Sequence, residues 1–109
     1  MDLVEATYKV TEGFPKRECY GITNQLRRAA VSVASNVAEG HARSTGDFIR
    51  HLSISSGSLA EMETQFMLSK RLGYLSGSDE QELLNVCEQV GRMLGRLRKV
   101  LRSRRESSP

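Results

Sequence analysis

The sequence has 109 residues, of which 39% are apolar, 27% are charged and 6% are aromatic, with a net charge of +3. This length suits one compact domain spanning residues 1 to 109 and is too short for two ordinary domains. The scarcity of aromatic residues and the absence of tryptophan favour a helical core over a β-sandwich. No apolar run approaches the roughly 18 residues that a membrane span needs, and no signal peptide pattern is present. We therefore expect a soluble cytoplasmic protein that does not enter a membrane.

The first predicted helix covers residues 2 to 12, where apolar residues recur every three or four positions. Gly13 and Pro15 end this helix, and we expect Phe14 to close one end of the fold. Eleven residues extend only about 16 Å, roughly half the length of the later helices. We therefore expect part of the bundle to be open or to be filled by another subunit.

The second predicted helix covers residues 19 to 41 and forms the centre of the fold. Its apolar residues are spaced by four, three, four and four, and they are Ile22, Leu26, Ala29, Val33 and Val37. Ser32, Ser35 and Asn36 accompany them, so we expect a neighbouring helix to approach closely and to find hydrogen-bonding partners here.

The third predicted helix covers residues 46 to 72, with Ser44 or Thr45 as its N-cap. Its apolar seam alternates four and three residues apart, and two seam positions are serines, Ser55 and Ser69. A segment rich in serine and glycine weakens the isolated helix, so we expect tertiary packing to stabilise it.

The fourth predicted helix covers residues 79 to 103 and begins with a capping box of Ser78 and Gln81. It carries ten apolar positions, more than one narrow face needs, which leaves an oligomer contact and a thicker core as alternatives. We expect the polar tail from Ser103 to Pro109 to fray. The predicted fold class is all-α, an antiparallel up-and-down four-helix bundle.

Metal and nucleophile chemistry find little support in the sequence. Di-iron bundles use inward carboxylates with Glu-x-x-His repeats. The candidate carboxylates are Glu39, Glu61, Glu63 and Glu88, and neither His41 nor His51 has a glutamate three residues before it. Cys19 and Cys87 are too few for a four-ligand zinc site or a disulfide framework, and we expect both to be reduced thiols. We therefore predict a non-enzymatic protein without a cofactor or metal.

A buried polar network is predicted between the second and third helices. Its members are Asn36, Glu39, Arg43 and Glu63. Such a network would fix the register of the two helices. Glu39 and Arg43 are also four residues apart, so they can pair on one helical face.

The basic residues are concentrated near the C-terminus. Residues 92 to 105 hold seven of the sixteen Lys and Arg and none of the thirteen acids. The predicted nucleic-acid-binding residues are Arg92, Arg96, Arg98, Lys99, Arg102, Arg104 and Arg105. Such a surface suits contacts with the phosphates of RNA or DNA without base readout, and a solvated face or a contact with an acidic protein remains an alternative.

Linked motifs give the sequence a family resemblance. The run YGITNQLRRAAVSVASNVAEGHARST at residues 20 to 45 is joined by FPKRE at 14 to 18, GSLAEMETQ at 57 to 65 and RLGYL at 71 to 75. Together they resemble the four-helix-bundle proteins related to the ribosomal RNA intervening-sequence protein. Members of that family usually carry further residues before the loop at residues 13 to 18, which supply most of a long first helix, and this sequence departs from that pattern.

The resemblance carries functional implications of its own. Some relatives are encoded inside ribosomal RNA intervening sequences, and others are accessory variability proteins of retroelements. The accessory proteins form pentamers and associate with nucleic acid and a reverse transcriptase. The resemblance therefore implies a homo-oligomer, by this likeness a pentamer, with RNA or DNA and a reverse transcriptase as candidate partners.

Overall fold

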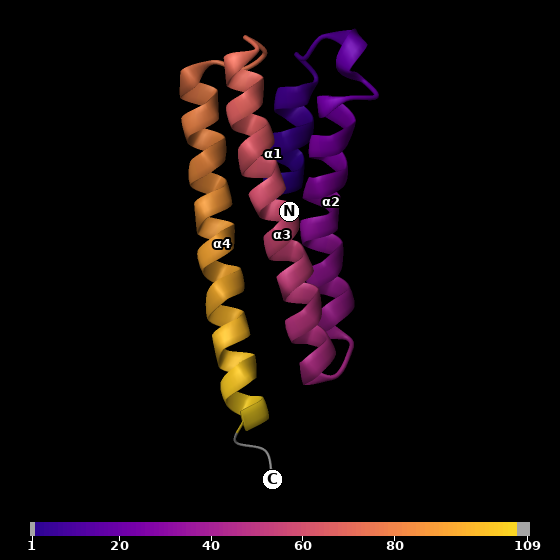
Figure 1. The fold of residues 1–109 in the computed structure, drawn as a ribbon, viewed down its shortest axis with the longest axis vertical. Coiled ribbons are helices and arrows are strands. Elements are labelled where there is room, and N and C mark those ends of the chain that lie inside the picture. Colours follow the sequence, from indigo (N-terminus) through magenta and orange to yellow (C-terminus); the bar gives the residue numbers. More distant parts are fainter. Residues whose placement is uncertain (1, 107–109) are drawn as a thin grey trace.

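The computed structural model describes residues 2 to 106 and contains four α-helices that run alternately up and down (Figure 1). They are α1 (Asp2–Thr11), α2 (Ile22–His41), α3 (Thr45–Arg71) and α4 (Gly77–Glu106). The fold is all-α, as predicted, with principal extents of 54 × 23 × 18 Å. α1 packs on α2 and α4, and α3 packs on both of the other long helices.

The helix ends follow local cap chemistry. The Ser44 hydroxyl accepts a hydrogen bond from the Asp47 amide at 3.3 Å, so Ser44 is the N-cap of α3, one of the two predicted residues. The α4 cap differs from the prediction, because the Ser76 hydroxyl, not Ser78, accepts from the Asp79 amide at 3.0 Å. Gly73 ends α3 with a φ of +81°, a conformation that glycine adopts without steric cost.

Two helix boundaries differ from the sequence prediction by three residues, and the others differ by at most two. Residues 19 to 21, expected to be helical, form a turn after a short 3-10 helix, η1 (Lys16–Glu18), so α2 begins at Ile22. At the C-terminus, helix α4 continues to Glu106, past the expected end at 103. Residues 107 to 109 of the predicted fraying tail lie outside the described residues.

The core is aliphatic and runs along the bundle axis. Its most deeply buried large side chains are Leu3, Leu26, Val33, Leu52, Met62, Phe66 and Leu94. The two seam serines of α3 are also fully buried. Ser55 donates to the Val33 carbonyl of α2 at 2.9 Å, and Ser69 donates to the Gln65 carbonyl at 2.8 Å, so neither hydroxyl is left unpaired.

Aromatic residues close the end of the bundle that holds η1. Phe14 is buried, as predicted, and its ring lies 5.6 Å from that of Tyr74. The Tyr74 hydroxyl donates to a Glu18 carboxylate oxygen at 2.9 Å. These contacts tie the loop after α1 to the turn after α3.

Helix α1 covers only part of the bundle, as its length predicts. In Figure 1 its N-terminus lies about halfway along the molecule, and α2, α3 and α4 continue beyond it. Arg27 of α2 holds it, donating to the Thr11 hydroxyl at 2.9 Å while its guanidinium lies 4.6 Å from the centre of the Tyr8 ring.

Candidate nucleic-acid interface

The basic segment, residues 92 to 105, forms the last four turns of α4 (yellow in Figure 1). Leu94 and Leu101 hold this part of the helix against the bundle, with 1% and 6% of their surfaces exposed. Arg92, Arg96 and Lys99 are four and three residues apart and all exposed. Because the buried leucines face inward, these three cations point away from the bundle. We call them the outward basic face.

The other four predicted cations lie elsewhere around α4. Arg98 is partly buried, and its Nε is enclosed with no hydrogen-bond partner among the described residues. Arg102, Arg104 and Arg105 are exposed at the end of the helix. The Arg105 guanidinium lies beside the start of α3, since a Cβ placed on Gly46 would be 3.7 Å from its Nη1. The seven cations are therefore distributed along the last four turns of α4 and do not form a single stripe.

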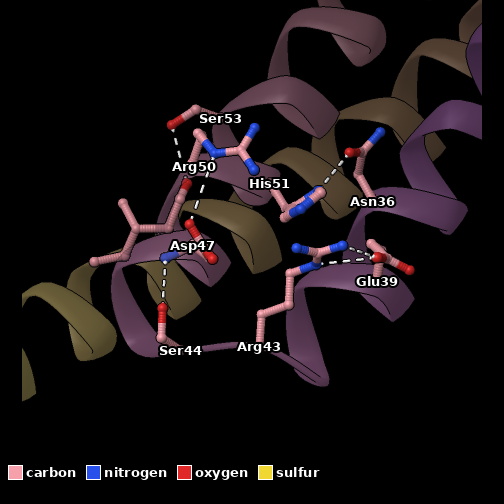
Figure 2. A network of polar contacts seen from close by, with 9 residues as sticks. Asn36, Glu39, Arg43, Ser44, Asp47, Arg50, His51 and Ser53 are labelled. Carbon is pink, nitrogen blue, oxygen red and sulfur yellow. Dashed lines mark hydrogen bonds and ion pairs between the residues drawn. The ribbon is translucent and has the colours of Figure 1, made fainter.

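Neighbouring carboxylates partly neutralise the positive charge of some of the cations at this end of the bundle. Arg92 pairs with Glu88 at 2.5 Å within α4. Arg50 lies 3.9 Å from Asp47 in the first turns of α3 (Figure 2). The excess positive charge at this end therefore comes mainly from the part of α4 that follows Arg92, where the sequence supplies no acid before Glu106.

The predicted pair of Glu39 and Arg43 forms at the end of α2 (Figure 2). The Arg43 Nε donates to a Glu39 oxygen at 3.0 Å. This hydrogen bond, reinforced by the Arg43 charge, holds the pKa of Glu39 below its ordinary value and raises the pKa of Arg43. About half of each side chain is exposed, so the pair is a surface contact and not part of a buried network.

The other two members of the predicted network make separate contacts. Asn36 does join α2 to α3, because its Oδ1 lies 2.8 Å from the Nδ1 of the buried His51 (Figure 2). Glu63 instead lies on the α4 side of α3, where its charge helps raise the pKa of Cys87. Asn36, Glu39 and Arg43 therefore lie on one side of α2, near His51, whereas Glu63 lies apart from them.

Other polar residues form the connection between α2 and α3. Gln65 donates to Gln25 at 2.9 Å, and Ser58 donates to Ser32 at 2.9 Å. Asn36 also donates to the Ser32 carbonyl at 2.9 Å, which leaves its Oδ1 facing His51. The small polar residues of both helices signal a close contact in the sequence, but the exact partners depend on the register.

Apart from the cationic surface, the described residues do not assemble a metal-binding or catalytic site. No group of three or more His, Cys, Asp or Glu side chains is placed to hold a metal ion between residues 2 and 106. Cys19 is exposed, whereas burial raises the pKa of the Cys87 thiol to about 12. None of the described helices is long and apolar enough to cross a bilayer.

The fold and this surface define a small all-helical bundle protein with a cationic end. The sequence model of the family described as 23S rRNA-intervening sequence protein matches residues 1 to 96, and the chain therefore belongs to that family. A search of curated proteins gave no match. The family match ends at Arg96, so five of the seven predicted cations lie beyond it.

Proposed function

We propose that this protein binds RNA or DNA through the phosphate backbone, using the basic segment of α4, and that it has no catalytic activity. The observation that carries the proposal is the series of seven cations without an intervening acid from residue 92 to 105. Exposed cations on a rigid helix can each replace a counterion on a phosphate. The family description, which names 23S rRNA, also fits a nucleic-acid ligand.

The proposed contact does little to distinguish one nucleotide sequence from another. Base recognition by stacking uses exposed aromatic side chains near the cations. The most exposed aromatic residue, Tyr20 at 92%, lies in the loop before α2, at the other end of the bundle from the basic segment. We therefore expect similar affinity for RNA and DNA of unrelated sequences and a strong dependence on salt.

Self-association would strengthen this binding. We propose that the protein is a homo-oligomer, because Met93 and Val100 of α4 are 45% and 47% exposed within the basic segment. They lie seven residues apart on one side of the helix, and contiguous exposed apolar patches often mark an interface. Several basic segments in one assembly would contact phosphates together, so weak individual sites would combine into avid binding.

The test is fluorescence anisotropy with a labelled RNA of about 20 nucleotides, its DNA equivalent and a duplex, from about 50 to 200 mM salt. We expect binding at the lowest salt that weakens steeply as salt rises. Replacing Arg92, Arg96 and Lys99 with Glu should weaken binding at least about tenfold and lower the salt slope by about two to three, one for each lost phosphate contact. Absence of binding by the unaltered protein at the lowest salt would exclude this function.

A matched control variant separates the effect of where the cations lie from the effect of the net charge of the protein. Arg28, Lys70 and Arg71 are exposed cations on α2 and α3, so reversing them to Glu changes the net charge by the same amount. We expect this variant to keep most of its affinity. Equal loss in both variants would show that binding depends on overall charge, and retained affinity in the α4 variant would move the site away from this helix. Binding of an acidic protein in place of nucleic acid is the alternative outcome.

A further inference from the structure

The N-terminus of α2 has no side-chain cap. Its N-cap residue is Gly21, and its first turn holds no acidic residue. The first hydrogen bond of the helix runs from the Gln25 amide to the Gly21 carbonyl at 3.0 Å, so the amides of residues 22 to 24 come before it. Such amides have no partner within the helix and carry partial positive charge. They are therefore available to a negatively charged acceptor.

The same turn contains a buried hydroxyl without a partner. Thr23 is only 8% exposed, and its Oγ1 makes no hydrogen bond to any of the described residues. The hydroxyls of the other two buried threonines, Thr7 and Thr11, both donate to main-chain carbonyls at 2.7 Å. An unpaired buried hydroxyl lowers stability, and native folds keep few of them without a reason.

Thr23 lies at a pocket between the C-terminus of α1, η1 and the first two turns of α2. Glu12 lines this pocket from the end of α1, Lys16 lines it from η1, and Thr23, Asn24 and Arg27 line it from α2. Its volume of about 220 Å³ is below the roughly 300 to 1,000 Å³ of sites for drug-sized ligands. The pocket therefore suits a single small group.

The charge of the pocket lining is positive. Of its charged residues, Lys16 and Arg27 are cations and Glu12 is an acid. Arg27 donates from Nε to the Thr11 hydroxyl and from Nη2 to the Tyr8 carbonyl, which leaves its Nη1 without a hydrogen-bond partner among the described residues. The amides at the start of α2 add to this positive charge, so a small anion is the ligand that the pocket favours.

We propose that this pocket binds a phosphate group through the first amides of α2, the Thr23 hydroxyl and the charges of Lys16 and Arg27. Rotation about the Cα–Cβ bond of Thr23 exchanges its hydroxyl and methyl groups, which are similar in size, so the enclosed hydroxyl turns toward the ligand. Phosphate oxygens accept several hydrogen bonds, and their charge strengthens each one. The proposal goes beyond the proposed function, because the pocket and the basic segment lie at opposite ends of the bundle (Figure 1).

Tyr20 indicates one source of such a phosphate group. It directly follows Cys19, which lines the pocket, and 92% of its surface is exposed. A free aromatic ring close to a phosphate site suits stacking with a nucleobase. The phosphate group therefore belongs either to free inorganic phosphate or to the end of a nucleic-acid strand whose base stacks on Tyr20.

The reactivity of Cys19 measures whether the pocket is occupied. Cys19 is exposed, whereas Cys87 is buried, so a neutral dipyridyl disulfide should react with Cys19 alone. We expect millimolar inorganic phosphate to slow this reaction along a saturating curve, because the bound phosphate covers the thiol. Potassium chloride at the same ionic strength should leave the rate unchanged. No effect of phosphate, or an equal effect of chloride, would overturn the proposal.

Replacement of Thr23 by valine separates phosphate binding from packing. Thr23→Val removes an unpaired hydroxyl, so it should raise the melting temperature of the protein without phosphate. The same change should weaken phosphate binding about tenfold, because a hydrogen bond to a charged group is lost. Thr7→Val is the matched control, because the Thr7 hydroxyl is paired with the Leu3 carbonyl. It should lower the melting temperature and leave phosphate affinity unchanged, and unchanged affinity in Thr23→Val would exclude the proposed contact.

Charge variants of the lining test the sign of the ligand. Lys16→Gln should weaken phosphate binding, and Glu12→Gln should tighten it, because the first removes a cation and the second removes a carboxylate. Lys9→Gln is the control, since Lys9 is an exposed cation of α1 outside this lining, and it should have little effect. Shifts of the two lining variants in the same direction would contradict an anion site.

Amide chemical shifts locate the bound phosphate along the chain. On titration with inorganic phosphate, the amide protons of Thr23 and Asn24 should move the most, because they donate to the ligand. The Asp47 amide at the start of α3 is the internal control, since the Ser44 hydroxyl already accepts from it. Equal shifts at the two helix starts would mean that phosphate acts only through ionic strength, which would exclude the site.

Two short single strands identify the source of the phosphate group. They have the same sequence, and one ends in a phosphate whereas the other ends in a hydroxyl. If the pocket holds a strand end, the phosphorylated strand should protect Cys19 at a lower concentration than inorganic phosphate does. Tyr20→Ala should then remove this advantage and leave protection by inorganic phosphate unchanged. Protection by inorganic phosphate without any advantage of the strand would assign the pocket to free phosphate.

The outcome is independent of nucleic-acid binding through α4. Protection of Cys19 by inorganic phosphate in a protein with no affinity for RNA or DNA would support the pocket and remove the proposed function. Binding of nucleic acid by a protein whose Cys19 inorganic phosphate does not protect would retain the proposed function and exclude this pocket as a phosphate site.

Discussion

Gly40 is the residue at which α2 and α3 leave no room for a side chain. A Cβ at this position would lie 2.8 Å from Cδ1 of Phe48 and 2.9 Å from Cβ of His51. We expect Gly40→Ala to lower the free energy of unfolding by about 1 to 3 kcal/mol, because overpacking outweighs the helix propensity gained.

Gly57 provides the control within α3. An added Cβ there would have nothing within 4 Å of it. Gly57→Ala should therefore raise the free energy of unfolding by about 0.5 to 1 kcal/mol. Urea denaturation measures both variants, and a stabilising Gly40→Ala would show that the two helices have room to separate.

Cys87 gives the fold a dependence on alkaline pH. Burial, with a smaller contribution from the Glu63 charge, raises the pKa of this thiol to about 12 from an ordinary value of 9.0. Above pH 9.0 the unfolded thiol loses its proton while the folded thiol keeps it. Stability that is fully present below that pH is therefore lost as pH rises toward the folded pKa, by up to about 1.4 kcal/mol per unit.

The measurement compares unaltered protein with Cys87→Ala in urea at about pH 8, 9.5 and 10.5, which bracket the ordinary pKa of a thiol. Tyrosine and lysine titrations affect both proteins, so the difference between them isolates Cys87. We expect the gap in unfolding free energy between unaltered protein and variant to narrow as pH rises. A gap that stays constant would mean that the thiol ionises equally well in the folded state.

The N-terminus of α4 has two candidate capping residues, Ser76 and Ser78. The Ser76 hydroxyl accepts the Asp79 amide, whereas the sequence pattern favours Ser78. We expect Ser76→Ala to cost about 1 kcal/mol of stability and Ser78→Ala about a few tenths at most. Thermal unfolding of the two variants decides which serine caps the helix, and the reverse order would restore the sequence prediction.

Across the whole molecule, α1 should be the least stable helix. It has ten residues, too few to be stable alone in water, and Leu3 is its most deeply buried apolar anchor. Leu3→Ala should therefore speed amide hydrogen exchange throughout α1 while the middle of α3 stays protected. Uniform acceleration in both helices would show that α1 unfolds only together with the rest of the bundle.

The sequence by itself determined the number, type and approximate ends of the helices. Apolar residues recurring every three or four positions require a buried helical face, wherever the partner helix lies. The same spacing identified the buried seam of α4, since Leu94 and Leu101 lie in the core. The concentration of cations near the C-terminus is also a property of the sequence alone.

Only the tertiary structure decided which polar residues meet. Asn36 and His51 are fifteen positions apart, and Gln25 and Gln65 are forty apart, so their pairing depends on how α2 and α3 align. Glu63 has the residue type that a polar network between α2 and α3 would use, but the rotation of α3 turns its side chain toward α4. The excess apolar positions of α4 were likewise ambiguous until the end of α1 fixed which of them stay exposed. Periodicity defines a face for each helix, whereas the distance and rotation between helices define the contacts.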